Sequence, residues 1–446
     1  MKAIVAGCLI AIAAVPAFTQ YNIIGYYPSW ERASFPASKL PLSSLSCVIH
    51  AFAWPGVDGS LQTGDGVPDA ALVTVVHGAK KKLLLSLGGA GNDIGFDSVS
   101  VHPERRSVFV KNVVLFLSQN HYDGIDIDWE QPGTNAQRDS MVSMIRELRS
   151  AFDSVNTEYL ITAAIPVTDY FGRWYNFPAL LPYMNWFNAM TYDYHGSWSS
   201  HAGHNAPLYA PNDAADYSVD QSIQYLLNTR HIPKEKLVLG IPFYGKRFHA
   251  VGLLTPFSGE EDLTYSEVVN MVSSGGWVYH WDSGAQVPYY TNGISLITFE
   301  DSISVSAKCS YAKSKQLAGV MIWELSQDVI ASGQPLFSAI VNGLTTGVDA
   351  SRETEMNTAK SFVLLRNYPN PFNPATTITF TLPQAAEVHL AVFDPLGREV
   401  ASLVNGLLVA GEHSTVFRAE NISSGIYYLR LTAGTVTAVD KLMVLK

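Results

Sequence analysis

Alternating carboxylates are the densest charged feature of the chain, with Asp126, Asp128 and Glu130 spaced two residues apart in the segment 123–130 (DGIDIDWE). In an extended strand, successive side chains point to opposite faces, so these three carboxylates share one face. Neighbours about 6–7 Å apart in a water-poor interior cannot all ionise without large mutual repulsion. At least one should hold a proton at neutral pH, as a general acid must. The spacing therefore predicts acid–base chemistry.

Two other interpretations of the segment stay open on spacing alone. The carboxylates could form the solvated face of a half-exposed strand, or they could hold a divalent cation. Oxygen-ligand sites for cations usually take their ligands from turning loops or from several elements. Asp123 is at an odd-numbered position, so on a strand its side chain would point away from the face shared by the three carboxylates. The cation site is therefore the weaker alternative.

Short β-rich runs alternate with longer helical patterns from residue 21 to about residue 343, which is typical of parallel strands joined by crossover helices. The expected strands are 23–27, 47–53, 83–87, 124–128, 160–165, 186–191, 237–242 and 319–323. This number of strands over roughly 320 residues predicts an α/β fold, a (β/α)8 TIM barrel, whose active sites lie at the C-terminal strand ends. A doubly wound open sheet is the alternative, but no Gly-rich phosphate loop follows the first strand.

The alternation breaks between residues 244 and 288, in a Gly- and aromatic-containing stretch that is too long for a strand-to-helix loop. We expect a short insertion after strand seven, at about 245–290. Residues 345–361 are polar and without periodicity, which predicts a linker. The catalytic barrel is accordingly expected at 20–344.

The C-terminal residues 362–446 have an all-β pattern with Pro- and Gly-bearing turns, which predicts a small β-sandwich domain. Its expected strands are 376–382, 388–393, 413–417, 426–431 and 438–444. All 9 Trp of the chain lie before this domain, which disfavours a carbohydrate-binding role for it.

The N-terminus predicts a secretory signal peptide at 1–19, because Lys2 is followed by an apolar run that ends in small residues. No later stretch reaches the ~20 apolar residues of a membrane span. Cys47 and Cys309 both lie in apolar contexts, which favours two buried free thiols over a disulfide.

The composition excludes some classes of partner. With 29 Lys+Arg against 39 Asp+Glu, the net charge is −10 and no basic cluster interrupts it, so a nucleic-acid partner is not expected. Hydrophobic residues make up 47% and charged residues 15%, so most of the chain should fold.

The segment 123–130 resembles the D-x-x-D-x-D-x-E signature on strand four of family 18 glycoside hydrolases, the chitinases and their relatives. Further segments resemble motifs of this family in the same order along the chain: SLGG at 86–89, MTYD at 190–193, GIPFYG at 240–245 and GVMIW at 319–323. The expected insertion resembles a shortened form of the small α+β subdomain that walls the substrate cleft in many of these enzymes.

The resemblance implies a substrate-assisted, retaining mechanism, for which the family is a known exception among glycosidases. Glu130 would protonate the glycosidic oxygen and later activate water. The 2-acetamido group of the sugar would attack the anomeric carbon, and Asp128 would supply the charge opposite the resulting oxazolinium ion. Asp126 would share a proton with Asp128, and Tyr192 would hold the acetamido oxygen.

The resemblance also implies a substrate pocket around these residues. Trp323 would form its floor under the distorted sugar, and Tyr26, Phe52, Met190 and Asp193 would line it. Outer stacking platforms could come from Trp30, Trp54, Trp174, Trp198 and Trp281, for each of which ordinary packing is an equal alternative.

One departure from the family concerns residue 90. Many relatives carry Trp directly after S-x-G-G, where this chain has Ala90. Stacking on the leaving-group side should therefore be weaker, or it should come from another loop.

The tail resembles the C-terminal sorting domain of the type IX secretion pathway, through the segments 367–374 (NYPNPFNP), 392–400 (VFDPLGREV), 424–428 (SGIYY) and 441–446. The resemblance implies export through an outer membrane and an extracellular or cell-surface location. A fibronectin-like spacer that stays attached is the alternative.

These resemblances together predict a secreted chitinase that acts as a monomer on chitin or N-acetylglucosamine oligosaccharides. An endo-β-N-acetylglucosaminidase acting on N-glycans or wall glycan is the alternative within the same chemistry. A non-catalytic chitin-binding lectin is a third possibility, but such relatives usually lack the acid at the position of Glu130. No metal or organic cofactor is implied.

Overall fold

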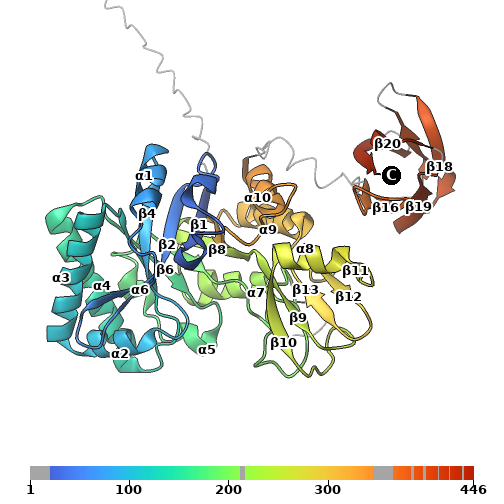
Figure 1. The fold of residues 1–446 in the computed structure, drawn as a ribbon. Coiled ribbons are helices and arrows are strands. Elements are labelled where there is room, and N and C mark those ends of the chain that lie inside the picture. The colour runs from blue at the N-terminus through green and yellow to red at the C-terminus, as the bar shows by residue number, and fades with distance from the viewer. Residues whose placement is uncertain are drawn as a thin grey trace, which may run out of the picture. The chain divides into compact units, whose positions relative to one another are not determined.

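The computed structural model describes residues 21–210, 216–345, 365–382, 386–394, 398–409, 411–420, 422–433 and 436–445 (Figure 1). They fall into two compact units, one before and one after the expected linker. The expected signal peptide at 1–19 and nearly all of the expected linker at 345–361 lie outside the described residues.

Eight parallel strands close the first unit into a barrel. They are β1 Asn22–Pro28, β2 Cys47–Pro55, β4 Lys82–Gly88, β5 Gly124–Asp128, β6 Leu160–Ile165, β7 Trp186–Ala189, β8 Leu237–Pro242 and β14 Gly319–Trp323. Each pairs with its sequence neighbour, and β1 pairs with both β2 and β14, so the sheet has no free edge. This arrangement confirms the predicted (β/α)8 barrel.

Helices follow the strands and cover the outside of the barrel (Figure 1). They are α1 Ala70–Gly78, α2 Asp93–Val101, α3 Pro103–Asn120, α4 Asn135–Val155, α5 Asp169–Gly172, α6 Phe177–Leu180, α7 Val219–Gln224, α9 Ser302–Ser314 and α10 Pro335–Thr345. Side chains of Asp69, Thr134 and Asp301 accept backbone N–H groups at the starts of α1, α4 and α9, which satisfies donors that a helix leaves free.

Several shorter elements complete the barrel unit. They are the strand β3 Leu61–Thr63, which pairs antiparallel with the end of β2, the 3-10 turns Ser29–Glu31, Ala37–Lys39 and Lys234–Lys236, and a π-helical turn over Tyr225–Thr229.

Successive side chains on the barrel strands alternate between two hydrophobic cores, one on each side of the sheet. Ile125 and Ile127 of β5 point outward and pack with the helices in one large cluster. The opposite parity faces the barrel interior, which is filled by a second cluster that includes Ile24, Tyr26 and Met321. The carboxylates of β5 have this interior parity, so the fold places them inside the barrel.

An antiparallel sheet with one helix is inserted after β8, the seventh barrel strand. Its elements are β9 Tyr244–Phe248, β10 Glu260–Thr264, α8 Tyr265–Ser273, β11 Val278–Asp282, β12 Val287–Thr291 and β13 Leu296–Thr298, in the strand order β10-β9-β13-β12-β11. The sheet extends past the expected end near residue 290, because β13 returns to pair with β9. It lies beside the barrel, in yellow in Figure 1.

The second unit consists of two antiparallel sheets, with orders β15-β16-β19 and β18-β17-β20-β21. Their strands are β15 Leu365–Tyr368, β16 Ala375–Leu382, β17 Ala386–Phe393, β18 Glu399–Leu408, β19 Gly411–Arg418, β20 Gly425–Ala433 and β21 Val436–Val444. The all-β prediction is confirmed. Two strands were not predicted: β15, a short edge strand, and β18, which contains Gly406 and has no fully buried side chain.

Cys47 and Cys309 are buried and free, as predicted. Among the described residues, no helix combines the length and the apolar character that crossing a membrane would require.

Candidate active site

The acidic row begins on β5 and continues past its end. Asp126 and Asp128 belong to the strand, whereas Glu130 lies on the loop that follows its C-terminal end. Trp129, which stands between Asp128 and Glu130 in the sequence, is buried and stacks on Phe96 with ring centroids 5.3 Å apart. Burying Trp129 turns Glu130 toward the opposite side, where it is half-buried at the barrel mouth.

Neighbouring backbone packs tightly against the end of β5. Gly88 has φ = +123°, and a Cβ on it would lie 2.0 Å from the carbonyl oxygen of Asp128. The next residue, Gly89, donates its N–H to that same oxygen at 2.9 Å. The Gly-Gly pair on the adjacent strand therefore allows the close approach that holds Asp128.

Asp126 is fully buried and receives hydrogen bonds from three side chains. The hydroxyl of Tyr26 donates to it at 2.6 Å, Thr162 Oγ1 at 2.5 Å and Asn188 Nδ2 at 3.0 Å. Burial raises its pKa to about 6, and the hydrogen bonds from Thr162, Tyr26 and Asn188 act in the opposite direction. The carboxylate form of Asp126 is thus well solvated by protein donors.

Asp128 is also buried, but its Oδ1 has no hydrogen-bond partner among the described residues. Burial raises its pKa well above the usual value, and the charges of Glu130, Asp126 and Asp93 raise it further. Asp128 is therefore the member of the row with the greatest tendency to hold a proton.

Glu130 has its pKa raised to about 7, first by burial and then by the charges of Asp93 and Asp193. Asp93 stands in the first turn of α2, and its own pKa is raised by burial while backbone hydrogen bonds from Gln131 and Glu130 oppose the rise. A carboxyl group with a pKa near the working pH can both donate and accept a proton during a reaction.

Tyr192 lies beyond the end of β7, which stops at Ala189 rather than at the expected residue 191. The turn is held by Thr191 Oγ1, which donates to the carbonyl oxygen of Gly240 at 2.6 Å. Burial, followed by the charge of Asp128, raises the pKa of Tyr192 well above its usual value. Its hydroxyl group therefore keeps its proton and is available as a hydrogen-bond donor.

A row of aromatic rings extends from the barrel mouth. Trp323, at the end of β14, stacks on Phe52 at 5.7 Å, and Phe52 stacks on Trp30 at 5.9 Å. Trp323 and Phe52 are half-buried, whereas Trp30 is 52% exposed. Such a row offers flat apolar surfaces beside the barrel mouth.

The expected lining residues differ in their surroundings. Tyr26 is fully buried, because its hydroxyl group faces Asp126 and its ring meets Trp323 edge-on at 5.2 Å. It therefore contacts Asp126 and Trp323 within the barrel rather than forming an open wall. Met190 is half-buried and Asp193 is exposed, and both follow β7 at the mouth.

The outer tryptophans also fall into two groups. Trp198 is 65% exposed, like Trp30, while Trp54, Trp174 and Trp281 are half-buried. Exposure therefore leaves Trp30 and Trp198 as the better stacking candidates.

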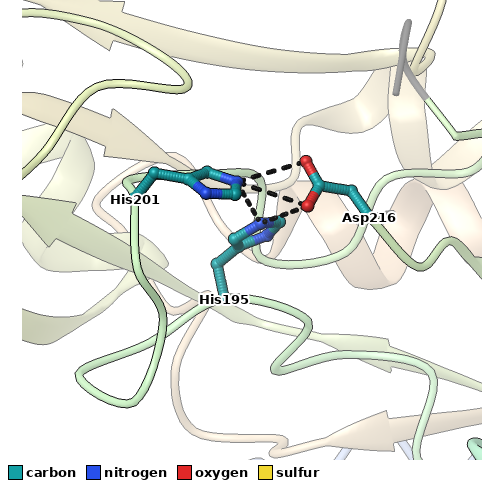
Figure 2. Close-up of side chains that lie close together, drawn as sticks. All are labelled: His195, His201 and Asp216. Atoms are coloured by element: carbon teal, nitrogen blue, oxygen red, sulfur yellow. Dashed lines mark hydrogen bonds and ion pairs between the residues drawn. The ribbon is translucent and has the colours of Figure 1, made fainter. Parts of the chain in front are cut away.

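One group of possible metal ligands occurs among the described residues, and it lies outside the acidic row. It consists of His195, His201 and Asp216, whose ligand atoms converge (Figure 2). No motif in the sequence pointed to these three residues.

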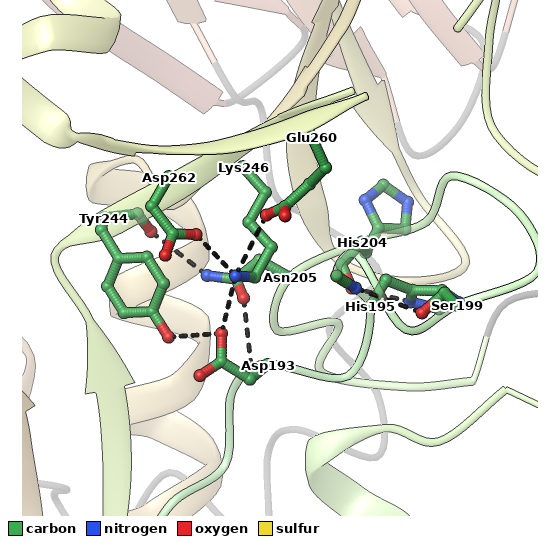
Figure 3. A network of polar contacts seen from close by, with 10 residues as sticks. Asp193, His195, Ser199, His204, Asn205, Tyr244, Lys246, Glu260 and Asp262 are labelled. Atoms are coloured by element: carbon green, nitrogen blue, oxygen red, sulfur yellow. Dashed lines mark hydrogen bonds and ion pairs between the residues drawn. The ribbon is translucent and has the colours of Figure 1, made fainter. Parts of the chain in front are cut away.

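The insertion contributes charged side chains that the sequence analysis also missed. Lys246 Nζ on β9 lies 3.0 Å from Asp193 Oδ1, 2.6 Å from Asp262 Oδ1 and 3.4 Å from Glu260 Oε1 (Figure 3). Tyr244, two residues earlier on the same strand, donates its hydroxyl to Asp193 at 2.7 Å. Tyr244 and Lys246 stand two residues apart on one strand, so the sequence could show that they share a face. It could not show that both contact Asp193, because Asp193 follows a different strand, β7.

Asn205 connects the same loop to the insertion. Its Oδ1 accepts the backbone N–H of Asp193 at 3.1 Å, and its Nδ2 donates to the carbonyl oxygen of Tyr244 at 3.3 Å (Figure 3). Asp193 adopts a left-handed φ of +59°, which Asp tolerates better than most residues. Asp193 is thus held in place from its backbone and from its side chain.

Comparison with known proteins agrees with this geometry. The family model "Glycosyl hydrolases family 18" matches residues 22–328, and the model "Secretion system C-terminal sorting domain" matches residues 366–445. The chain is 30% identical to "Chitinase 1" of Aphanocladium album over 354 residues, which cover 68% of this chain and 80% of the relative.

Two further relatives extend this picture. The chain is 34% identical over 275 residues to "Probable chitinase 2" of Drosophila melanogaster, covering 55% of this chain and only 56% of that relative. Among solved structures, the Ostrinia furnacalis Group II chitinase catalytic domain 2, a mutant in complex with penta-N-acetylchitooctaose, (NAG)5, matches with a TM-score of 0.69 and 26% identity, covering 74% of this chain and 97% of that one. With an acidic row that begins on β5 inside a closed barrel and a family match over most of its length, the chain belongs to family 18 of the glycosyl hydrolases.

Proposed function

We propose that this chain is a secreted chitinase that hydrolyses β-1,4 bonds between N-acetylglucosamine units with retention of configuration. The observation that carries the proposal is the contrast within the acidic row: Glu130 is half-buried at the mouth with a pKa of about 7, and Asp128 is buried beside it with a raised pKa. One group can release a proton at neutral pH, and the other can become a counter-charge.

In the first step, Glu130 donates its proton to the glycosidic oxygen as the bond to the anomeric carbon breaks. The carbonyl oxygen of the substrate's own 2-acetamido group forms the new bond to that carbon, which gives an oxazolinium ion. In the second step, Glu130 takes a proton from water, and the water oxygen opens the oxazolinium ring. Two displacements at the same carbon retain its configuration.

Asp128 stabilises the positive charge that develops on the acetamido group. Because Asp126 and Asp128 are close and buried, their titration belongs to the pair, and one proton is shared between them. The donors around Asp126 favour its ionised form, which leaves the shared proton on Asp128 until the oxazolinium charge appears, when the proton moves to Asp126. Tyr192 supports the same step as a hydrogen-bond donor to the acetamido oxygen.

The aromatic row supports a polysaccharide substrate. The apolar faces of pyranose rings can stack on Trp323 near the carboxylates and on Trp30 further out. Asp193 and Met190 complete the proposed binding surface at the end of β7. We propose N-acetylglucosamine oligosaccharides and chitin as the ligands.

The sorting domain marks the chain for secretion. We propose that the type IX machinery reads this domain and delivers the protein to the cell surface or the medium. The enzyme is expected to act as a monomer.

The decisive experiment compares chitohexaose, fully deacetylated chitosan and an N-glycosylated protein as substrates for the full chain. A chitinase using its substrate's acetamido group cuts chitohexaose, with the β-anomer formed first in a proton NMR time course, and leaves chitosan intact. Equal cleavage of chitosan would exclude the substrate-assisted mechanism. Release of N-glycans without cleavage of chitohexaose would instead identify an endo-β-N-acetylglucosaminidase, and binding without any cleavage would identify a lectin.

A further inference from the structure

Two histidines and one aspartate converge beside the loop that follows β7. His195 and His201 lie on that loop, and Asp216 lies shortly before α7 (Figure 2). The Nε2 atoms of His195 and His201 are 3.3 Å apart. Asp216 Oδ1 lies 3.4 Å from His195 Nε2 and 3.3 Å from His201 Nε2. The three ligand atoms thus form a nearly equilateral triangle.

The size of this triangle fits a four-coordinate metal ion. Zinc binds His nitrogen at 2.0–2.1 Å and carboxylate oxygen at about 2.0–2.2 Å in tetrahedral geometry, which places neighbouring ligand atoms about 3.3–3.4 Å apart. The three side-chain atoms occupy three corners of such a tetrahedron without any rearrangement.

The tautomer of His195 gives an independent reason for a cation. Its Nδ1 lies 3.0 Å from the carbonyl oxygen of His204, which can only accept, so Nδ1 carries the hydrogen. In the neutral ring, the lone pair on Nε2 then faces the carboxylate of Asp216 and Nε2 of His201. One proton can lie along only one edge of the triangle, whereas a cation at its centre satisfies all three atoms.

The site is also pre-organised. The side chains of His195 and Asp216 are 6% and 9% exposed. The imidazole ring of His195 packs on Gly203, where a Cβ would lie 2.4 Å from the ring. Hydrogen bonding of Nδ1 to a backbone carbonyl is the usual support of a metal-binding histidine. His201 is 28% exposed, so solvent reaches the site at this ligand.

We propose that His195, His201 and Asp216 bind one divalent transition-metal ion, with Zn²⁺ as the best fit and water as the fourth ligand. Imidazole nitrogens favour zinc, copper or nickel, whereas calcium and magnesium prefer all-oxygen sites. The family resemblance implied no metal, and the proposal departs from that expectation; the three ligands stand at 195, 201 and 216 without a recognisable motif.

The proposed role of the ion is structural. It connects Asp216 to the loop that begins with Tyr192 and Asp193, in the same region where Ala202 exchanges backbone hydrogen bonds with residues 254 and 255 of the insertion. Binding a metal only in the folded state stabilises that state. The inference does not depend on the proposed function, because metal binding is measured without substrate.

The test uses the purified full chain, without a polyhistidine tag, after dialysis against a chelator. Titration calorimetry with Zn²⁺ should show one saturable equivalent, and Zn²⁺ should raise the melting temperature. Co²⁺ should give the intense visible absorption bands of a four-coordinate ion. Absence of saturable binding by the wild type would overturn the proposal.

Two variants and one control locate the site. His201→Ala removes the most exposed ligand and should weaken Zn²⁺ binding by more than about 100-fold, and Asp216→Asn should have a similar effect. His102→Ala removes an exposed histidine on another part of the barrel and should bind normally. Circular dichroism checks that each variant is folded. Unchanged binding in a folded His201→Ala or Asp216→Asn variant would refute this assignment.

Discussion

At the scale of single residues, the acidic row is asymmetric because its members have different hydrogen-bond partners. Asp126 receives three side-chain donors, Asp128 leaves one oxygen without a partner in the described part of the chain, and Glu130 faces the mouth. All three have raised pKa values because of burial, but only the first is compensated by donors. Similar side chains on one strand can therefore perform different tasks.

Glu130→Gln should lower kcat on chitohexaose by about 10²–10⁴-fold, because an amide cannot donate the required proton. KM should change little, since the side chain keeps its shape and polarity. Glu158→Gln, on an exposed turn, is the matched control and should behave as wild type. Retention of more than about a tenth of wild-type turnover would remove Glu130 from the acid role.

Asp128→Asn should abolish most of the turnover but stabilise the fold. The folded-state pKa of Asp128 is raised, so wild-type stability falls as pH rises above the usual aspartate value and the buried group ionises. The variant has no group to ionise at this position, so its free energy of unfolding should exceed that of wild type by an amount that grows between pH 5 and pH 8 and reaches about 1–3 kcal/mol. Urea unfolding at both pH values measures the difference, and a variant less stable than wild type at pH 8 contradicts the argument.

The alkaline limb of kcat/KM should report the ionisation of Glu130, with loss of activity as pH rises through about 7. Asp93→Asn removes the largest charge contribution to that raised pKa while keeping an acceptor oxygen for the loop. The pKa of Glu130 should fall in this variant, and the alkaline limb of the pH–rate profile should therefore move to lower pH. A pH–rate profile of both proteins checks this, and an unshifted limb would show that Asp93 does not tune Glu130.

At the scale of elements, the site is assembled from strand ends and from the inserted sheet. β5 and the loop after it supply the acids, the turn after β7 supplies Tyr192 and Asp193, and β14 ends at Trp323. β9 of the insertion adds Lys246, which lies against Asp193. Strand ends and the first residues after them thus place the reacting groups, while the longer loops and the insertion supply the surrounding surface.

Trp30→Ala tests the outer end of the aromatic row. Removing an exposed ring should raise KM for chitohexaose by about 3–10-fold, because a stacking contact is worth about 0.5–1.5 kcal/mol. Turnover at saturation should persist, and short substrates that do not reach the ring should be unaffected. Equal effects on short and long oligosaccharides would indicate that Trp30 only supports Phe52, on which it stacks.

At the scale of the whole molecule, the chain has two units with separate hydrophobic cores. The barrel core includes Ile125 and Phe187, and the core of the sorting domain includes Ile378 and Leu431. A domain with its own core can fold independently. The chemistry and the secretion signal are therefore carried by separable parts of the chain.

Truncation after Thr345 should leave hydrolysis of chitohexaose and the melting transition of the barrel unchanged, because α10 already ends there. Calorimetry of the full chain should show an additional transition from the sorting domain. The truncated protein should fail to be exported in a cell with the type IX machinery. A large loss of kcat after truncation would contradict separable units.

Much of the fold could be predicted because its signals are local. Short β-rich runs between helical patterns indicated each barrel strand, although the strand after Leu160–Ile165 ended two residues earlier than expected. The inserted sheet was too short in the prediction because its last strand is recognised only by its pairing with β9. β18 was missed because its residues are weakly patterned and Gly406 interrupts them.

Sequence alone determined which side chains share a face, because alternation on a strand is a property of the local backbone. It therefore grouped Asp126, Asp128 and Glu130 before any tertiary contact was known. Only the tertiary structure decided their surroundings: Tyr26 reaches Asp126 from 100 residues away, and Lys246 reaches Asp193 from another element. Burial and neighbouring groups set the proton affinity of the carboxylates and the geometry of the proposed metal site. Both arise from contacts between segments that are distant along the chain.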